Sequence, residues 1–294
     1  MGDLPWPATA IGRAAELAGP AASVAAVRVL AGGTHARTCL IRTANPQLEM
    51  VVRQFPPGDD AASREAEVLA ALGGLDGLAP RLLASAPDDG SPEGSWVLIS
   101  RLPGTADITP ARPSAAAAQL GRVLARIHAT SPHRCAGLHG VLDRPGGSAA
   151  AMSGPAAGAV AARWDLLAGA PGVLTHHDFW SGNVVWDEGI LTGVVDWTGA
   201  GTGPRGFDVG WCRLDLYLLH GEHAAGTFLD SYQAASGSGL ASRLLADLWA
   251  VARSHDQVET WVPNYRDLGR ADLTASELRR RHTAWTEQLL ANQL

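Results

Sequence analysis

Residues 175–186 read THHDFWSGNVVW, and this stretch decides the fold. One apolar strand is expected at 173–175, leading into the stretch, and another at 184–186, leading out of it. The polar residues between these strands include Asp178 and, five positions later, Asn183. They are therefore expected on a tight loop that rigid elements hold at both ends.

A second carboxylate, Asp196, lies thirteen residues after Asn183. It directly follows the apolar strand expected at 191–195. Phosphoryl transfer needs one carboxylate that faces the attacking hydroxyl. It also needs an amide oxygen and a second carboxylate that hold magnesium against the phosphates. A single loop Asp such as Asp178 is more often a cap or a turn residue, but the three polar residues with apolar strands between them favour this chemistry.

The motif His-x-Asp-x-x-x-x-Asn, followed by an apolar strand and Asp, resembles the aminoglycoside phosphotransferase family of the protein-kinase-like superfamily. The run GPRGFD at 203–208 resembles the segment that follows the metal-binding Asp in that family. The resemblance covers nearly the whole chain. It implies that Asp178 is the catalytic aspartate and that Asn183 and Asp196 are magnesium ligands. The chain departs from the family at His177, where Gly is common.

Two further polar residues of this region have structural interpretations. His176 is expected to brace the catalytic loop rather than to carry a proton. Asp208 is expected either to cap a helix that starts at Val209 or to tie down the catalytic loop.

The resemblance and the hydrophobic pattern together predict an α+β, two-lobed protein-kinase-like fold, with a β-rich N-lobe containing one main helix and a mostly helical C-lobe. The pattern predicts strands at 27–30, 38–43, 49–55, 81–84 and 96–102 and a helix at 61–72. Pro103-Gly104 breaks the chain, and the helical pattern beyond it starts at 114–128. We therefore expect a nucleotide-binding lobe at 1–103 and a catalytic and acceptor-binding lobe at 104–294.

Nucleotide contacts are expected in the first lobe. Gly32 and Gly33 lie between two strands, where the kinase-like fold places its phosphate-covering loop, although a plain turn is an equal alternative. Arg53 interrupts an apolar strand and needs a partner, because burying an unpaired ion is costly. Glu65 shares the buried face of the helix and is the natural candidate.

By the resemblance, Arg53 and Glu65 correspond to the strand Lys and helix Glu that hold the α- and β-phosphates. Arg differs from the commoner Lys because it is planar and bidentate. The alternative is an Arg that extends out of an edge strand to solvent. Backbone groups at Val97 and Ile99 are expected to recognise the adenine of ATP, with GTP as an alternative nucleotide and Mg²⁺ as the metal.

The acceptor pocket is expected in the helical second lobe, and the chain's net charge of −6 favours a cationic small molecule. Most acidic residues on helices are simply solvated, so each is a weak candidate by itself. The candidate acidic residues are Asp215, Glu222, Asp230, Asp256 and Glu259, and the candidate aromatic walls are Trp180, Trp249, Trp261 and Tyr265.

Composition narrows the class of protein further. Hydrophobic residues make up 46% of the chain, which is enough for a globular core, and the acidic balance argues against nucleic-acid partners. Three widely spaced cysteines indicate neither a disulfide framework nor a zinc site. No apolar run is long enough for a membrane span, and the N-terminus does not resemble a signal peptide. We therefore expect a cytoplasmic protein, monomeric or dimeric.

These patterns predict an ATP-dependent O-phosphotransferase that acts on a cationic small molecule, with an aminoglycoside-type antibiotic as first choice. A metabolic kinase for choline, an amino sugar or homoserine is the nearest alternative. A protein kinase is disfavoured, because only twelve positions separate Asp196 from Asp208 and no Ala-Pro-Glu segment follows. A non-catalytic kinase-like binding protein would be expected to lack Asp178, Asn183 or Asp196.

Overall fold

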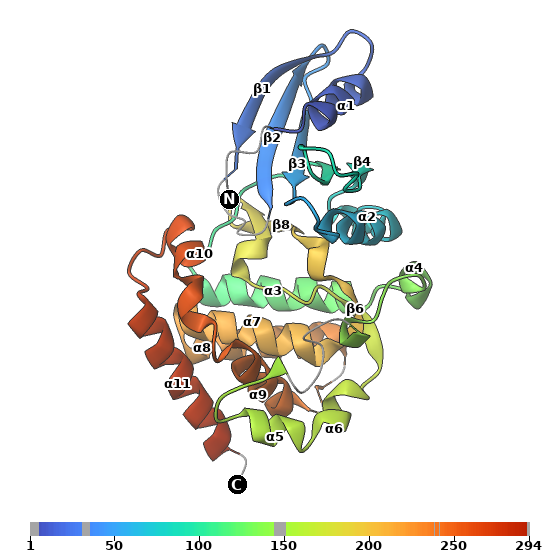
Figure 1. Ribbon diagram of the computed structural model, residues 1–294. Coiled ribbons are helices and arrows are strands. Elements are labelled where there is room, and N and C mark those ends of the chain that lie inside the picture. Colours follow the sequence, from blue (N-terminus) through green and yellow to red (C-terminus); the bar gives the residue numbers. More distant parts are fainter. Residues whose placement is uncertain (1–5, 31–35, 144–150, 238, 241, 293–294) are drawn as a thin grey trace. The chain divides into compact units, whose positions relative to one another are not determined.

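The computed structural model describes residues 6–30, 36–143, 151–237, 239–240 and 242–292 (Figure 1). Gly32 and Gly33, the expected phosphate-loop residues, lie outside the described residues. The chain divides into two compact units: Met1–Pro103 with Thr192–Thr198, and Gly104–Leu191 with Gly199–Leu294. The segment Thr192–Thr198 thus belongs to the first unit, whereas the sequence placed it in the second lobe.

The first unit is built on a five-stranded antiparallel sheet with the strand order β1-β2-β3-β5-β4 (Figure 1). Its elements are α1 (Ala8–Ala18), β1 (Ser23–Val29), β2 (Arg37–Ala44), β3 (Glu49–Gln54), α2 (Ala61–Leu72), η1 (Leu75–Gly77), β4 (Leu82–Ala86) and β5 (Trp96–Ser100). All five predicted strands and the predicted helix at 61–72 are present. The expected α+β fold class is confirmed.

A small core joins the sheet to α1. Ile41, Val52 and Leu98 are fully buried side chains of β2, β3 and β5, and they cluster with Ala10 and Ala14 of α1. The sequence predicted one main helix in this unit and missed α1. Small side chains on this helix let it lie close to the sheet.

The second unit is mostly helical. Its helices are α3 (Pro113–His128), α4 (Pro132–Cys135), η2 (Val141–Asp143), α5 (Ala157–Ala161), α6 (Trp164–Ala168), α7 (Arg205–His220), α8 (Glu222–Ser236), α9 (Arg243–Ser254), η6 (Val258–Trp261), α10 (Val262–Asp267) and α11 (Ala275–Ala291). Helix α8 packs on α3 and α7, and α7 also packs on α9 (Figure 1). Among the described residues, no helix is both long and apolar enough to cross a membrane.

Two glycines allow these helices to approach closely. A Cβ atom at Gly121 of α3 would lie 2.4 Å from the carbonyl oxygen of Phe228 on α8. A Cβ at Gly210 of α7 would lie 2.2 Å from the carbonyl oxygen of Ala246 on α9. Both distances are far below a van der Waals contact, so only Gly fits at these crossings.

Short strands flank the predicted catalytic loop. β6 (Gly172–Thr175) pairs with β9 (Gly201–Pro204), and β7 (Val184–Asp187) pairs with β8 (Ile190–Val194). Two 3₁₀ turns, η4 (Ser181–Asn183) and η5 (Trp197–Gly199), complete the region. The strands expected at 173–175, 184–186 and 191–195 are therefore present. They hold the loop at both ends as the sequence predicts.

Stability is expected to depend on pH through His282 of α11, whose side chain is buried. Its Nε2 lies 2.9 Å from Ser254 Oγ and 3.1 Å from the carbonyl oxygen of Val251. Burial, aided by the charges of Arg279 and His255, lowers the pKa of His282 to about 4. The unfolded chain takes up this proton near pH 6.5, whereas the folded chain does so only near pH 4.

The contribution of His282 is therefore complete above pH 6.5 and is lost as the pH falls toward 4. Between pH 7 and 5 this amounts to about 2 kcal/mol of unfolding free energy. Urea unfolding of the wild type and of His282→Gln at both pH values checks this. The substitution should flatten the pH dependence. If the unfolding free energy of the variant depends on pH as that of the wild type does, His282 does not cause the pH dependence.

Candidate active site

The predicted catalytic aspartate is held by two neighbouring side chains of the second unit. Asn183 Nδ2 donates to Asp178 Oδ2 at 2.9 Å and to the Asp178 carbonyl oxygen, also at 2.9 Å. Trp211 Nε1, from α7, donates to Asp178 Oδ1 at 3.1 Å. Both carboxylate oxygens are thus oriented by donors. The amide of Asn183 directs Nδ2 to Asp178, so Oδ1 is the atom left for a ligand.

Asp208 ties the loop to α7. Its buried carboxylate accepts hydrogen bonds from the backbone N–H of His176 at 2.7 Å and of His177 at 2.6 Å. His128 Nε2 lies 3.1 Å from the same carboxylate. Burial by itself would raise the pKa of Asp208, but hydrogen bonding and the charges of His128 and His176 outweigh it and lower that pKa. Asp208 therefore stays ionised.

This geometry decides between the two interpretations of Asp208. The helix begins at Arg205 rather than at Val209, and Pro204 occupies its N-cap position. Asp208 therefore lies within the first turn and is not the cap, so that alternative is wrong. The side chain of His176 is fully buried and packs edge-on against Phe179 at 6.1 Å, as expected of a residue that braces the loop.

His177 and Asp196 both adopt a left-handed backbone conformation, each with φ of 64°. Non-glycine residues rarely adopt this conformation, and it carries a strain of about 1 kcal/mol or more. The first of these positions is the one where the resembled family commonly has Gly. The His177 ring lies 5.7 Å from Phe207 and 6.3 Å from Trp249, so its packing offsets part of this cost.

In the first unit, Arg53 joins Glu65 and Asp196. Its side chain is buried, pairs with Glu65 and places Nη2 2.8 Å from Asp196 Oδ1. β3 lies between β2 and β5, so Arg53 does not extend from an edge strand, and that alternative is wrong. Glu65 also accepts a hydrogen bond from the backbone N–H of Trp197 at 3.3 Å. The pairing predicted from the sequence is present, and Asp196 is an additional member.

The electrostatics of this trio follow from two carboxylates that share one guanidinium. Burial by itself would lower the pKa of Arg53, but Glu65 and Asp196 outweigh it and raise that pKa, so the side chain stays charged. Burial, reinforced by Asp196, raises the pKa of Glu65 to about 7 even though Arg53 lowers it. Asp196 is the more exposed carboxylate, at 30% of its side chain. An oxygen donor in a cluster with excess negative charge fits a hard cation such as Mg²⁺.

The structure does not support the prediction that backbone groups of Val97 and Ile99 recognise adenine. Both residues lie in β5, a central strand. Val97 is opposite Arg53 on β3 and Ser85 on β4, and Ile99 is likewise flanked on both sides. A central strand uses its backbone groups in the sheet, so those of Val97 and Ile99 are already engaged.

Three of the five acidic residues proposed for the acceptor pocket have hydrogen-bond or ion-pair partners within the protein. Asp215 is buried and accepts hydrogen bonds from Ser181 and Tyr265. Glu222 accepts from Gln288, and Glu259 pairs with Arg279. The remaining two, Asp230 and Asp256, are exposed.

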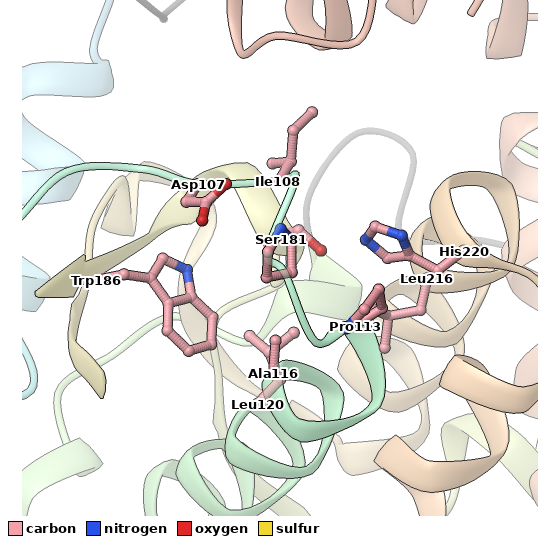
Figure 2. A pocket seen from close by; sticks show the side chains of 10 residues that line it. Asp107, Ile108, Pro113, Ala116, Leu120, Ser181, Trp186, Leu216 and His220 are labelled. Atoms are coloured by element: carbon pink, nitrogen blue, oxygen red, sulfur yellow. The ribbon is translucent and has the colours of Figure 1, made fainter. Parts of the chain in front are cut away.

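A pocket of about 220 Å³, including its open mouth, lies in the second unit (Figure 2). Figure 2 shows Ser181 between Trp186 and His220, above Ala116 and Leu120 of α3. Ser181 belongs to the η4 turn, but Asp178 and Asn183 do not line the pocket. Its volume is below the range of drug-sized ligand sites, so it is not a candidate for a large acceptor.

The structure thus assembles two groups of predicted site residues: Asp178 with Asn183 in the second unit, and Arg53 with Glu65 and Asp196 in the first. The sequence prediction missed the contact of Asp196 with Arg53 and that of Trp211 with Asp178. Trp211 lies 33 positions from Asp178, so only the packing of α7 against the loop brings the two together. No local spacing indicates it.

Comparisons with known proteins show the family and the fold of the chain. The model of a family described as the phosphotransferase enzyme family matches residues 26–245. No curated protein matches the sequence. A solved structure from Ralstonia eutropha JMP134, provisionally assigned as an aminoglycoside phosphotransferase, shares 18% identity over 97% of both chains, with a TM-score of 0.65.

Two further solved structures are similar. Aminoglycoside phosphotransferase APH(4)-Ia, in a ternary complex with AMP-PNP and hygromycin B, shares 16% identity over 90% of this chain and 94% of that one, with a TM-score of 0.59. Macrolide 2'-phosphotransferase MphH from Brachybacterium faecium shares 19% identity over 88% and 91%, with a TM-score of 0.52. These similarities show a common fold.

Proposed function

The chain belongs to the phosphotransferase enzyme family, and from this premise we propose that it transfers the γ-phosphoryl group of ATP or GTP to a hydroxyl group of a small molecule. One observation carries the proposal. The Asp178 carboxylate lies on a loop tied down by Asp208, with Asn183 and Trp211 orienting its two oxygens. A carboxylate fixed in this way is suited to orient an attacking alcohol.

Each remaining residue has a role in this proposal. Asp178 accepts the hydrogen bond of the acceptor hydroxyl and aligns it for in-line attack on the phosphorus. Arg53, fixed by Glu65, binds the α- and β-phosphates. Asn183 and Asp196 are the residues that would supply oxygen ligands to Mg²⁺, and the ion would neutralise negative charge on the phosphates. No covalent enzyme intermediate is needed.

The nucleotide part of the proposal draws support from a neighbour of the same fold. APH(4)-Ia has been crystallised with AMP-PNP or ADP together with hygromycin B. We propose that residues 101–103, directly after β5, contact the adenine. A small-molecule acceptor is favoured over a peptide because only twelve positions separate Asp196 from Asp208.

The proposal predicts that ADP forms only when both Mg²⁺ and an acceptor alcohol are present. The purified protein is incubated with ATP and, in turn, aminoglycosides, macrolides, choline, amino sugars and homoserine, and ADP is measured in a coupled assay. Removal of Mg²⁺ with EDTA should abolish turnover, because the phosphate charges are then not neutralised. Added Mg²⁺ should restore it. ADP formation that is insensitive to EDTA would contradict the assigned metal ligands.

A further inference from the structure

Helix α7 meets the catalytic loop along one of its faces. Asp208, Trp211 and Asp215 follow one another at spacings of three and four residues, which places them on the same face of the helix. Asp208 accepts hydrogen bonds from backbone N–H groups at the start of the loop, and Trp211 donates to the Asp178 carboxylate. Asp215, the third residue of this face, contacts the loop farther along the chain.

Asp215 holds this later part of the loop through Ser181. Its Oδ2 accepts hydrogen bonds from the backbone N–H of Ser181 at 3.0 Å and from Ser181 Oγ at 2.5 Å. Ser181 and Leu216, the residue that follows Asp215 in α7, line the same pocket (Figure 2). The loop is thus attached to α7 near both of its ends, by Asp208 and by Asp215.

The turn that begins at Ser181 carries Asn183. The backbone N–H of Asn183 donates to the carbonyl oxygen of Trp180 at 3.0 Å and closes the η4 turn. Asn183 Nδ2 in turn donates to the Asp178 carboxylate at 2.9 Å. Because the turn is closed, a displacement of Ser181 moves the amide that orients Asp178. Asp215 is therefore connected to the catalytic carboxylate through this turn.

Helix α10 holds the same region through Tyr265. This residue is 2% exposed and donates its hydroxyl to Asp215 Oδ1 at 3.0 Å. Its ring packs edge-on against Trp180 at 5.8 Å. The Trp180 ring lies against Gly182, where a Cβ atom would be only 2.2 Å away. The segment 180–182 is therefore packed against Tyr265 as well as bonded to Asp215.

The charge of Asp215 is costly to the folded state. The residue is 4% exposed, and its partners among the described residues, Ser181 and Tyr265, are neutral donors. Burial raises the pKa of Asp215, although both partners lower it. A buried charge with neutral partners reduces stability, but hydrogen bonds to a charged acceptor are stronger than those to a neutral one. The charge therefore strengthens the attachment of Ser181 and weakens the fold.

We propose that Asp215 is a positioning residue for phosphoryl transfer, which fixes the turn carrying Asn183 and, through that amide, the Asp178 carboxylate. This inference rests on the proposed function, because it assigns a further residue to the same reaction. Asp215 is too deeply buried to touch a substrate and acts through Ser181. A misplacement of about 1 Å in such a loop can lower a rate about a hundredfold.

Kinetics and stability together separate positioning from a structural role. Asp215→Asn keeps an oxygen that accepts from Ser181 but removes the charge, so kcat should fall about tenfold while the KM for ATP stays within about twofold. Its melting temperature should not fall, because a buried charge has been removed. Asp215→Ala removes the acceptor and should lower kcat about a hundredfold. The control Asp165→Asn, at an exposed position of α6, should leave kcat and melting temperature unchanged.

Amide hydrogen exchange of the free protein tests the attachment without nucleotide or acceptor. The Ser181 amide should exchange at least about tenfold faster in Asp215→Ala than in the wild type, because its acceptor is gone, and Asp215→Asn should lie between the two. In the double variant Ser181→Ala with Asp215→Asn, the two reductions of kcat should not multiply. Both substitutions weaken one attachment, so their effects overlap.

The outcomes distinguish this inference from the proposed function. Equal exchange at Ser181 in the wild type and in both Asp215 variants would overturn the attachment. Faster exchange with a wild-type kcat, or a loss of kcat in Asp215→Asn that accompanies a lower melting temperature, would overturn the positioning role. If the wild type phosphorylates no acceptor, the proposed function fails and the positioning role fails with it, whereas faster exchange in the variants would still show that Asp215 holds the turn.

Discussion

Asp178→Asn is expected to reduce phosphoryl transfer about a thousandfold or more while the protein stays folded. The substitution keeps the shape of the side chain, so the donor from Trp211 still has an oxygen partner. It removes the negative charge that aligns the acceptor hydroxyl and accepts its proton. Single-turnover measurements with saturating Mg-ATP and acceptor give the rate of the chemical step directly.

Asp187→Asn is the matched control for this prediction. Asp187 is exposed at the end of β7, nine positions from Asp178, and should have a kcat within about twofold of wild type. Nucleotide affinity should be similar in both variants and in the wild type. An Asp178→Asn protein that retains more than about a tenth of the wild-type rate would contradict the role assigned to Asp178.

Arg53→Met is expected to lower the free energy of unfolding by about 3–5 kcal/mol and to abolish measurable ATP binding. The substitution leaves the buried Glu65 carboxylate without the guanidinium that compensates it, and Asp196 loses the same partner. Urea unfolding gives the stability, and calorimetric titration of Mg-ATP gives the affinity. The expected loss of stability is larger than removal of an exposed ion pair would cause.

A double variant separates stability from function. In Arg53→Met with Glu65→Leu, apolar side chains replace both members of the buried pair, which commonly restores stability. ATP binding should remain absent, because no cation is left for the α- and β-phosphates. If the double variant binds ATP as the wild type does, Arg53 is a structural residue only. Wild-type stability of the single variant would contradict the buried pair itself.

The sequence was most informative where local periodicity decides structure. Apolar and β-branched runs predicted the strands β2 and β3, and the helical spacing of Glu65, Val68 and Leu72 predicted α2 with its observed bounds. Glu65 could be paired with Arg53 from the sequence because both had to lie on buried faces. A buried charge needs a partner of opposite charge that is also buried, and this condition limits the candidates strongly.

Features that depend on tertiary packing could not be predicted in the same way. The hydrogen bonds of Asp208 to the catalytic loop span 31 and 32 positions, and the sequence allowed helix capping as an equal interpretation. Val97 was assigned to adenine because the order of strands in the sheet, with β5 between β3 and β4, is not written in local spacing. Likewise, nothing local indicates that Arg53 also binds Asp196.

The class of acceptor could be predicted only from composition, and a cationic acceptor stays a prediction. A net charge of −6 favours a cationic ligand, but it is a property of the whole chain and does not say which carboxylates a ligand can reach. Glu259 pairs with Arg279, and Asp215 is buried. Trp211, which donates to Asp178, is not among the aromatic residues that the sequence suggested for the pocket.

Direct transfer of a phosphoryl group from ATP to an acceptor hydroxyl is tested most directly by mass spectrometry of the reaction mixture. With Mg-ATP and the acceptor panel, the wild type should add about 80 Da to one or more acceptors, and Asp178→Asn should yield no such product. The mass of the protein itself should stay unchanged. A phosphoryl group found on the protein instead of an acceptor, or equal product from Asp178→Asn, would contradict the claim.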